Sequence, residues 1–115
     1  MTRTKSGRRS SQRDIVLVEY PFSDLQASKV RPALVVSNDE VNRSEDCIVV
    51  SITSVNRPFS IPIADDDLSD GILYRQSFVR TDHINTISQA VIKTRIGALS
   101  QEAFDRIKTE ILRAF

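Results

Sequence analysis

Six short segments, each apolar or alternating in polarity, come before the only stripe of apolar residues at helical spacing. The segments lie at 14–20, 31–37, 47–53, 59–63, 77–83 and 91–98. Short strands at such close spacing favour a small barrel or an open sheet. The stripe follows Ser100, a candidate N-cap, and contains Ala103, Phe104, Ile107, Ile111 and Leu112. We therefore predict a mainly β fold in which one C-terminal helix covers a face or an end of the sheet.

Two of these segments indicate their position in the sheet. The segment at 47–53 is almost entirely apolar, which is typical of an interior strand. The segment at 59–63 contains Pro62, which cannot donate a ladder hydrogen bond and so indicates an edge strand. The stretches at 22–30, 38–46, 54–58 and 64–71 are rich in polar residues, and we expect loops there.

The segment Lys29-Val30-Arg31-Pro32-Ala33-Leu34-Val35-Val36-Ser37 holds the first candidate functional residue. Pro32 disfavours helical backbone at Arg31, so Arg31 is expected to open an extended strand. A guanidinium is a planar set of donors that matches a phosphate or a carboxylate. Its position alone favours an ordinary ion pair with a carboxylate.

The chain has 115 residues, which is enough for one domain with one modest core. Residues 1–13 hold five basic side chains and no acid, whereas the rest of the chain has a net charge of −4. We predict a disordered basic tail at 1–13 and a folded domain at 14–115. The tail is expected to be solvated, and any contact with nucleic acid through it is expected to be weak and salt-dependent.

Several classes of function are disfavoured by what the sequence contains. The one cysteine, Cys47, lies in an apolar run and is expected to be a buried small hydrophobe. His83 is the one histidine, and no cysteine lies at metal-ligand spacing from it. Asp65, Asp66 and Asp67 lack the pattern of a calcium loop. No glycine-rich phosphate loop, nucleophile elbow, membrane-spanning run or secretory signal is recognisable, so we expect a cytoplasmic protein without metal or cofactor.

Polar residues gather at the ends of two predicted strands. Arg31 opens one strand, and Ser51, Thr53 and Ser54 close the next, while Ser28, Lys29 and Asn56 lie in the adjoining loops. If the strands are neighbours, Arg31 and Thr53 converge, and a guanidinium beside a hydroxyl suits a phosphate or an oxyanion. From the residues alone, the simpler interpretation of Thr53 is an ordinary β-former.

The same segments resemble the MazF/PemK family of toxins from toxin–antitoxin systems. The resemblance lies in Asp14-Ile15-Val16-Leu17-Val18, Pro21-Phe22-Ser23-Asp24-Leu25 and the segment from Lys29 to Ser37. It continues in Ser51-Ile52-Thr53-Ser54, Ser77-Phe78-Val79-Arg80-Thr81-Asp82-His83-Ile84 and Ile96-Gly97-Ala98-Leu99-Ser100. It covers nearly everything after the basic tail.

The resemblance implies an SH3-like, partly open β-barrel with a C-terminal α-helix, of the PemK/CcdB-like kind, assembled as a homodimer. It implies a metal-independent endoribonuclease that cuts single-stranded RNA at short sequences and is blocked by a cognate antitoxin, with operator DNA bound only through the antitoxin. By motif match, the catalytic residues are Arg31 and Thr53. The residues expected to contact RNA are Ser28, Lys29, Ser54, Asn56, Ser77 and His83.

The mechanism implied is attack of a 2′-hydroxyl on the adjacent phosphorus, which gives a 2′,3′-cyclic phosphate and a 5′-hydroxyl. An arginine stays protonated at neutral pH, so Arg31 is expected to stabilise charge on the phosphorane rather than to act as a base. Thr53 is expected to bind a non-bridging oxygen. The family often has glutamine at the position of His83, which puts the base preference in doubt. It often has glycine at the position of Arg13, a difference that we expect to matter little.

Two other classes of function stay open from the sequence. One is a non-catalytic module that binds DNA or protein, such as a gyrase-type toxin or a co-repressor that acts with an antitoxin. The other is a structural subunit, which requires Arg31 to be buried in a salt bridge. For a dimer, Phe59, Ile61 and Phe115 are candidate interface residues, because small barrels have edges that need cover.

Overall fold

The computed structural model describes residues 9–21, 28–73 and 75–115. These residues form a sheet whose strands are β1 (Asp14–Pro21), β2 (Ser28–Val35), β3 (Asp46–Thr53), β4 (Ser60–Ile63), β5 (Leu68–Gly71), β6 (Ser77–Ser88) and β7 (Ile92–Leu99). The helices are α1 (Asp39–Asn42) and α2 (Gln101–Leu112), and short 3₁₀ turns lie at η1 (Asp65–Asp67) and η2 (Gln89–Val91).

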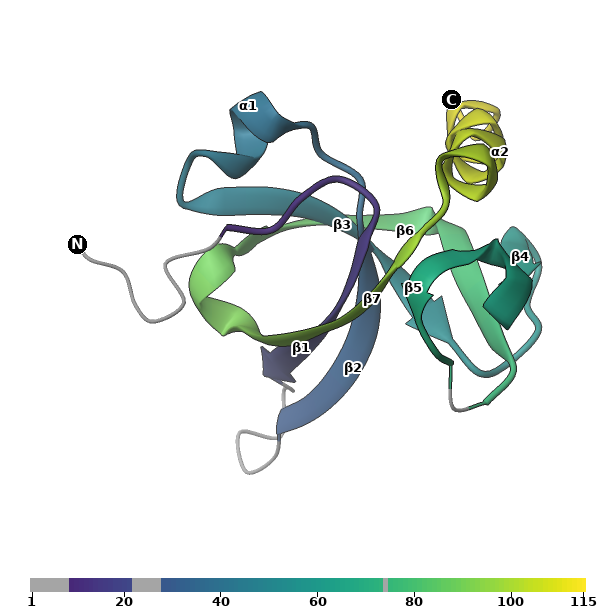
Figure 1. Ribbon diagram of the computed structural model, residues 1–115, viewed down its shortest axis with the longest axis horizontal. Coiled ribbons are helices and arrows are strands. Elements are labelled where there is room, and N and C mark those ends of the chain that lie inside the picture. The colour runs from purple at the N-terminus through teal and green to yellow at the C-terminus, as the bar shows by residue number, and fades with distance from the viewer. Residues whose placement is uncertain (1–8, 22–27, 74) are drawn as a thin grey trace.

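The strands pair in the order β4-β6-β3-β2-β1-β7-β5, and every pair is antiparallel. The sheet curls into a partly open barrel, and α2 lies at the end where β4 and β5 are found (Figure 1). The predicted mainly β fold with a C-terminal helix is therefore confirmed. The edge position of the strand with Pro62 and the interior position of β3 are confirmed as well.

Four segments differ from the prediction. β2 begins at Ser28, three residues before the predicted start, because β1 continues to pair with it as far as Pro21. β6 extends to Ser88, because β3 pairs with it along its whole length. The other two, α1 and β5, lie in segments expected to be loops. Asn38 caps α1 by accepting a hydrogen bond from the Val41 amide, and β5 pairs with β7 through its backbone.

The sheet buries apolar side chains on both of its faces. On the helix face, α2 packs over a core formed by Ile15, Leu34, Val50, Ile52, Ile63, Val79, Leu99, Ala103, Phe104, Ile107 and Ile111. On the opposite face, which we call the second face, lies a core formed by Val16, Val18, Ala33, Val35, Cys47 and Val49. Neighbouring residues of a strand alternate between the faces.

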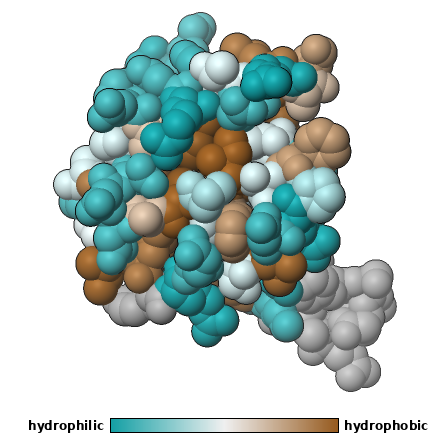
Figure 2. Space-filling view, turned by 90° about the vertical axis from the view of Figure 1, so that its right-hand side faces the viewer, coloured by the Kyte–Doolittle hydropathy of each residue, from teal (hydrophilic) through white to brown (hydrophobic). Residues whose placement is uncertain are grey.

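Helix α2 begins at the predicted cap. The Ser100 hydroxyl accepts a hydrogen bond from the Ala103 amide at 3.1 Å. The predicted apolar stripe is buried except at its C-terminal end, where Leu112 is 62% exposed. The side of the molecule that carries α2 shows a small hydrophobic recess surrounded by mainly hydrophilic residues (Figure 2).

Residues just before β1 contact the barrel, although the sequence places them in the tail. The Arg13 amide donates to the Val35 carbonyl, and the Arg13 guanidinium donates to the Leu99 carbonyl at 2.8 Å. Arg13 has a φ of 82°, in the left-handed region that favours glycine. The replacement of glycine by arginine here is therefore not neutral for the backbone. Residues 1–8 of the predicted tail lie outside the described residues.

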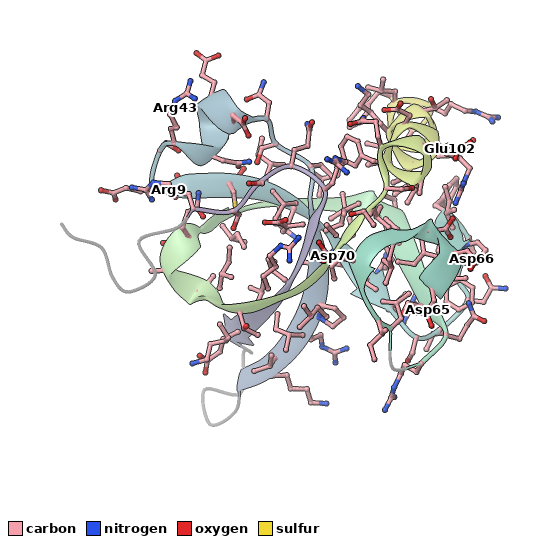
Figure 3. The ribbon with its side chains drawn as sticks, in the orientation of Figure 1. Arg9, Arg43, Asp65, Asp66, Asp70 and Glu102 are labelled. Atoms are coloured by element: carbon pink, nitrogen blue, oxygen red, sulfur yellow. The ribbon has the colours of Figure 1, made fainter. Side chains whose placement is uncertain are left out.

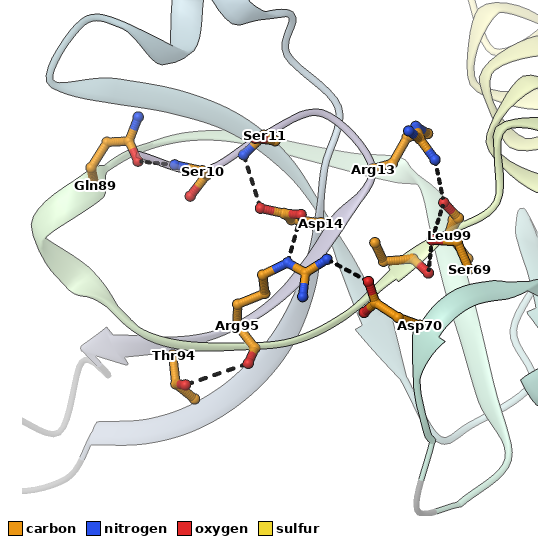
Figure 4. Close-up of polar contacts among 11 residues, drawn as sticks. Ser10, Ser11, Arg13, Asp14, Ser69, Asp70, Gln89, Thr94, Arg95 and Leu99 are labelled. Atoms are coloured by element: carbon orange, nitrogen blue, oxygen red, sulfur yellow. Dashed lines mark hydrogen bonds and ion pairs between the residues drawn. The ribbon is translucent and has the colours of Figure 1, made fainter. Parts of the chain in front are cut away.

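An ion-pair network holds the start of β1 against β7 and β5. Arg95 donates from Nε to Asp14 and from Nη2 to Asp70, both at 2.9 Å (Figure 4). Asp14 is buried, and its other carboxylate oxygen accepts from the Ser11 amide. The hydrogen bonds to Asp70 and Asp14 raise the pKa of Arg95 above its ordinary value.

Candidate active site

Arg31 and Thr53 lie at corresponding positions of two neighbouring strands. β2 and β3 pair from Val35 opposite Val49 to Ala33 opposite Ser51. Arg31 and Thr53 each lie two residues beyond the last of these pairs, and therefore on the same face of the sheet as Ala33 and Ser51. Arg31 also pairs with Val18 of β1, which belongs to the core of the second face. Both candidate catalytic residues therefore lie on the second face, beside the end of its core.

A bulge of three extra residues in β6 brings further polar residues to this face. Val50 pairs with Ile84, but Ile52 pairs with Val79, so β6 has three more residues than β3 between these two pairs. An odd number of extra residues reverses which side chains face which side. Val79 therefore packs on the helix face, whereas Ile87 packs on the second face.

His83 reaches the same face through this bulge. Its Nδ1 lies 2.5 Å from the Ser51 hydroxyl and 3.5 Å from the Asn85 amide nitrogen. A hydroxyl that donates to Nδ1 leaves the proton of the neutral imidazole on Nε2. His83 is exposed, so in this tautomer its Nε2 donor is available to a ligand. The arrangement suits the binding of a base edge or of a phosphate.

Arg80 lies on the second face at the other end of the bulge. It pairs with Ser60 of β4. The preceding pair, Val79 with Ile61, faces the helix, so the pair of Arg80 with Ser60 faces the other way. Phe78, which shares its side, pairs with Thr53. Arg31 and Arg80 therefore approach β3 from its two neighbouring strands, on the face that carries Ser51 and Thr53.

The other predicted RNA-contacting residues are placed less uniformly. Lys29 is exposed on β2, two residues before Arg31 and on the same face, and Ser54 and Asn56 are exposed in the loop after β3. Ser28 begins β2, but its side chain lies outside what the structure describes. Ser77 is buried opposite Ile63, on the helix face, and donates to the Arg75 carbonyl. Ser77 therefore does not join Arg31 and Thr53.

Both ends of the molecule carry charges of both signs, with Asp39 and Glu40 in the first turn of α1 and Arg106 of α2 beside Asp67. Arg9 and Arg43 lie near α1, whereas Asp65, Asp66 and Glu102 lie at the end with α2 and β4 (Figure 3). Around the candidate site, the described charged side chains on β2 and β6 are Lys29, Arg31, Arg80 and Asp82. A net positive group of this kind favours an anionic ligand.

Cys47 and the acidic segment do not contribute reactive groups to this site. The pKa of the Cys47 thiol is raised from 9.0 to about 11, chiefly by burial and also by the nearby negative charge of Asp46. Within the described residues, no three histidine, cysteine, aspartate or glutamate side chains are grouped as metal ligands. None of the described helices is long and apolar enough to cross a membrane.

Comparison with known families matches residues 11–115 to the PemK-like, MazF-like toxins of type II toxin–antitoxin systems. The chain belongs to this family. The match covers the whole described sheet, α2 and both strands that carry Arg31 and Thr53. No curated protein matches the sequence.

Solved structures share the PemK-like fold over most of their length. A Mycobacterium tuberculosis toxin, MazF-mt6, is 25% identical, with a TM-score of 0.71 over 90% of this chain and 96% of that one. A mycobacterial endoribonuclease in complex with its cognate antitoxin is 20% identical, with a TM-score of 0.74 over 91% and 93%. A MazE–MazF complex from Deinococcus radiodurans is 15% identical, with a TM-score of 0.72 over 91% and 94%.

Arg80 and Asn85 were not among the residues that the sequence analysis proposed for the site. In an unbroken strand, residues 79, 81, 83 and 85 share one face, and 80, 82 and 84 share the other. This rule places Arg80 and His83 on opposite faces, whereas the bulge places them on the same one. The sequence carries no local signal for the bulge, because its residues differ little from those of a regular strand.

Proposed function

We propose that this protein is an endoribonuclease that cleaves single-stranded RNA at selected sequences, as the toxin of a toxin–antitoxin pair. The observation that carries the proposal is the common position of Arg31 and Thr53 at the end of the second-face core. Membership of the MazF-like family supports it. So does the similarity to a solved structure described as a mycobacterial endoribonuclease.

In the proposed reaction, the ribose 2′-hydroxyl attacks the adjacent phosphorus and loses its proton to solvent. The bond from phosphorus to the 5′-oxygen breaks, and that oxygen takes up a proton. The products are a 2′,3′-cyclic phosphate and a 5′-hydroxyl. Arg31 stabilises the extra negative charge of the phosphorane, and Thr53 donates its hydroxyl to a non-bridging oxygen. Written in this way, the reaction requires no metal ion.

Replacement of Arg31 by alanine tests this role. We expect kcat to fall by about 10²- to 10³-fold, because one preorganised donor to the transition state is lost. Arg31 is exposed, so the thermal midpoint of unfolding should change little. The readout is cleavage of total RNA in the presence of a chelator, with mass spectrometry of the fragment ends.

Arg113→Ala is the matched control, because it removes the same charge from the exposed end of α2. Cleavage by Arg31→Ala at the rate of this control would place the catalytic centre elsewhere. Fragments with 3′-hydroxyl ends would contradict the proposed chemistry. Loss of wild-type cleavage on chelation would contradict the metal-independent mechanism.

We also infer that a cognate antitoxin neutralises the toxin and that the toxin is a homodimer. Two of the similar solved structures are complexes of a toxin with its antitoxin. Phe59 and Phe115 are 69% and 88% exposed, as expected of residues that a second chain covers, whereas Ile61 packs against the helix-face core. Sedimentation of the purified chain gives the oligomeric state, and a neighbouring reading frame that suppresses its toxicity identifies the antitoxin.

A further inference from the structure

Arg80 has an unsatisfied hydrogen-bonding group inside the molecule. Arg80 Nε is buried and has no hydrogen-bond partner. Among the described residues that are not exposed, every other buried side-chain nitrogen or oxygen has one. Arg80 Nη2 donates to Asp82 over 3.4 Å, which is long for such a contact. A guanidinium carries five N–H donors. Most of the donors of Arg80 are therefore unused within the described structure.

Two other arginines, Arg95 of β7 and Arg13 just before β1, are held by shorter hydrogen bonds to other elements. Arg95 makes two hydrogen bonds of 2.9 Å, to Asp14 and Asp70, and the guanidinium of Arg13 donates to the Leu99 carbonyl at 2.8 Å. These contacts join separate strands. Arg80, in contrast, contacts a residue only two positions away on its own strand, so its ion pair holds no other element in place.

The position of Arg80 fits a role in the candidate active site. It lies on the second face of β6, and Arg31 lies on the same face of β2, with β3 between them. Where three strands pair side by side, the backbones of the outer two lie about 10 Å apart, and β2 pairs with β3 as far as Ala33, two residues from Arg31. Arginine side chains that project from backbones this far apart have the reach to contact different phosphates of one strand.

We propose that Arg80 binds an RNA phosphate next to the one that is cleaved, an inference that rests on the proposed ribonuclease function. In the free protein, Asp82 holds the guanidinium through one long hydrogen bond. A phosphate offers two acceptor oxygens in a geometry that matches the guanidinium fork, so it replaces the carboxylate when RNA binds. Arg80 thereby contributes to substrate affinity and register, and Arg31 to the chemical step.

Binding of a 2′-O-methyl oligoribonucleotide tests this inference without cleavage, because the attacking hydroxyl is blocked. For Arg80→Met, which keeps an apolar side chain of similar length, we expect weaker binding. The slope of log K against log salt should become shallower by about 0.7, which corresponds to one lost phosphate contact on a single strand. Arg80→Lys should retain most of the slope, and Arg113→Ala should match the wild type.

Thermal unfolding separates this role from a structural one. If Arg80 binds phosphate, Arg80→Met should keep the unfolding midpoint of the wild type, because a buried unsatisfied donor is removed along with a weak ion pair. In cleavage assays, KM should rise more than kcat falls. A salt slope equal to that of Arg113→Ala would overturn the inference, as would a lowered midpoint with unchanged binding. Absence of cleavage by the wild type would instead overturn the proposed function.

Discussion

At the scale of the residue, Arg31 illustrates how the fold changes the meaning of a side chain. From the sequence, its position before Pro32 favoured an ion pair, and a purely structural subunit required that pair to be buried. The structure places Arg31 at an exposed position of β2, which contradicts that requirement. Its register with Val18 then places it on the face that carries Thr53.

His83 allows a separate test of the chemistry. Its Nδ1 contacts Ser51, and with the proton on Nε2 neither nitrogen of the neutral ring is free to take a proton from the substrate. We expect His83→Gln to cleave RNA with a pH dependence parallel to that of the wild type over about pH 5 to 8, the range in which histidines commonly titrate. The expected change is in the cleaved sequence, because glutamine presents a different pattern of donors and acceptors. Sequencing of the 5′ ends of the fragments measures this change.

Thr86→Ala is the control for the His83 variant, because Thr86 is exposed on the same strand and pairs with Ile48 away from the site. A pH profile that loses a limb in His83→Gln, but not in Thr86→Ala, would assign acid–base catalysis to His83. An unchanged cleavage sequence would remove His83 from base recognition.

At the scale of the element, the sequence predicted those segments that bury side chains in a regular pattern. β1 and β3 bury runs of apolar residues on both faces of the sheet, α2 buries an apolar stripe at helical spacing, and both patterns are visible in the chain. β5 was missed because three of its four residues are exposed. It is held by backbone pairing with β7, which leaves no periodic pattern in the side chains.

The pairing of β5 with β7 depends on Gly71. Its φ is 87°, and a Cβ added there would lie 2.4 Å from the Ile96 carbonyl oxygen and 2.5 Å from the Gly97 Cα. We therefore expect Gly71→Ala to lower the free energy of unfolding by about 1–3 kcal/mol, because alanine is strained in this conformation. Denaturant titration measures the effect.

Ser69→Ala provides the control on the same strand, because Ser69 is exposed and its hydroxyl makes only contacts of 3.4 and 3.5 Å. Its free energy of unfolding should stay within about 0.5 kcal/mol of the wild type. Equal stability of the two variants would show that β5 adjusts its backbone without cost. Because β5 carries none of the candidate site residues, both variants should keep RNA cleavage at temperatures where they are folded.

At the scale of the whole molecule, the buried Cys47 links stability to pH. Its pKa is about 11 in the folded protein and 9.0 when unperturbed, so between these values the unfolded chain releases a proton that the folded protein keeps. Stability should therefore fall as pH rises above 9.0, at up to about 1.4 kcal/mol per pH unit from this thiol. Below pH 9.0 the thiol is protonated in both states and has no such effect.

Comparison with Cys47→Ala isolates this effect from the other groups that titrate at high pH. We expect the free energy of unfolding of the wild type to decrease more steeply than that of the variant between pH 9 and 11. The absolute stability of the variant is lower because a buried side chain is shortened, but its slope is the informative quantity. Parallel slopes would mean that the folded protein exposes the thiol to solvent.

The sequence by itself determined six of the seven described strands, the terminal helix and the family resemblance that singles out Arg31 and Thr53, because apolar patterns and short motifs are local properties of a chain. Only the tertiary structure decided which residues share the site. The bulge in β6 reverses the alternation of faces, so Arg80 and His83 lie with Thr53, while Ser77 is buried on the helix face. The extra residues are defined by pairing with β3, and such a register between distant segments is not encoded by either segment alone.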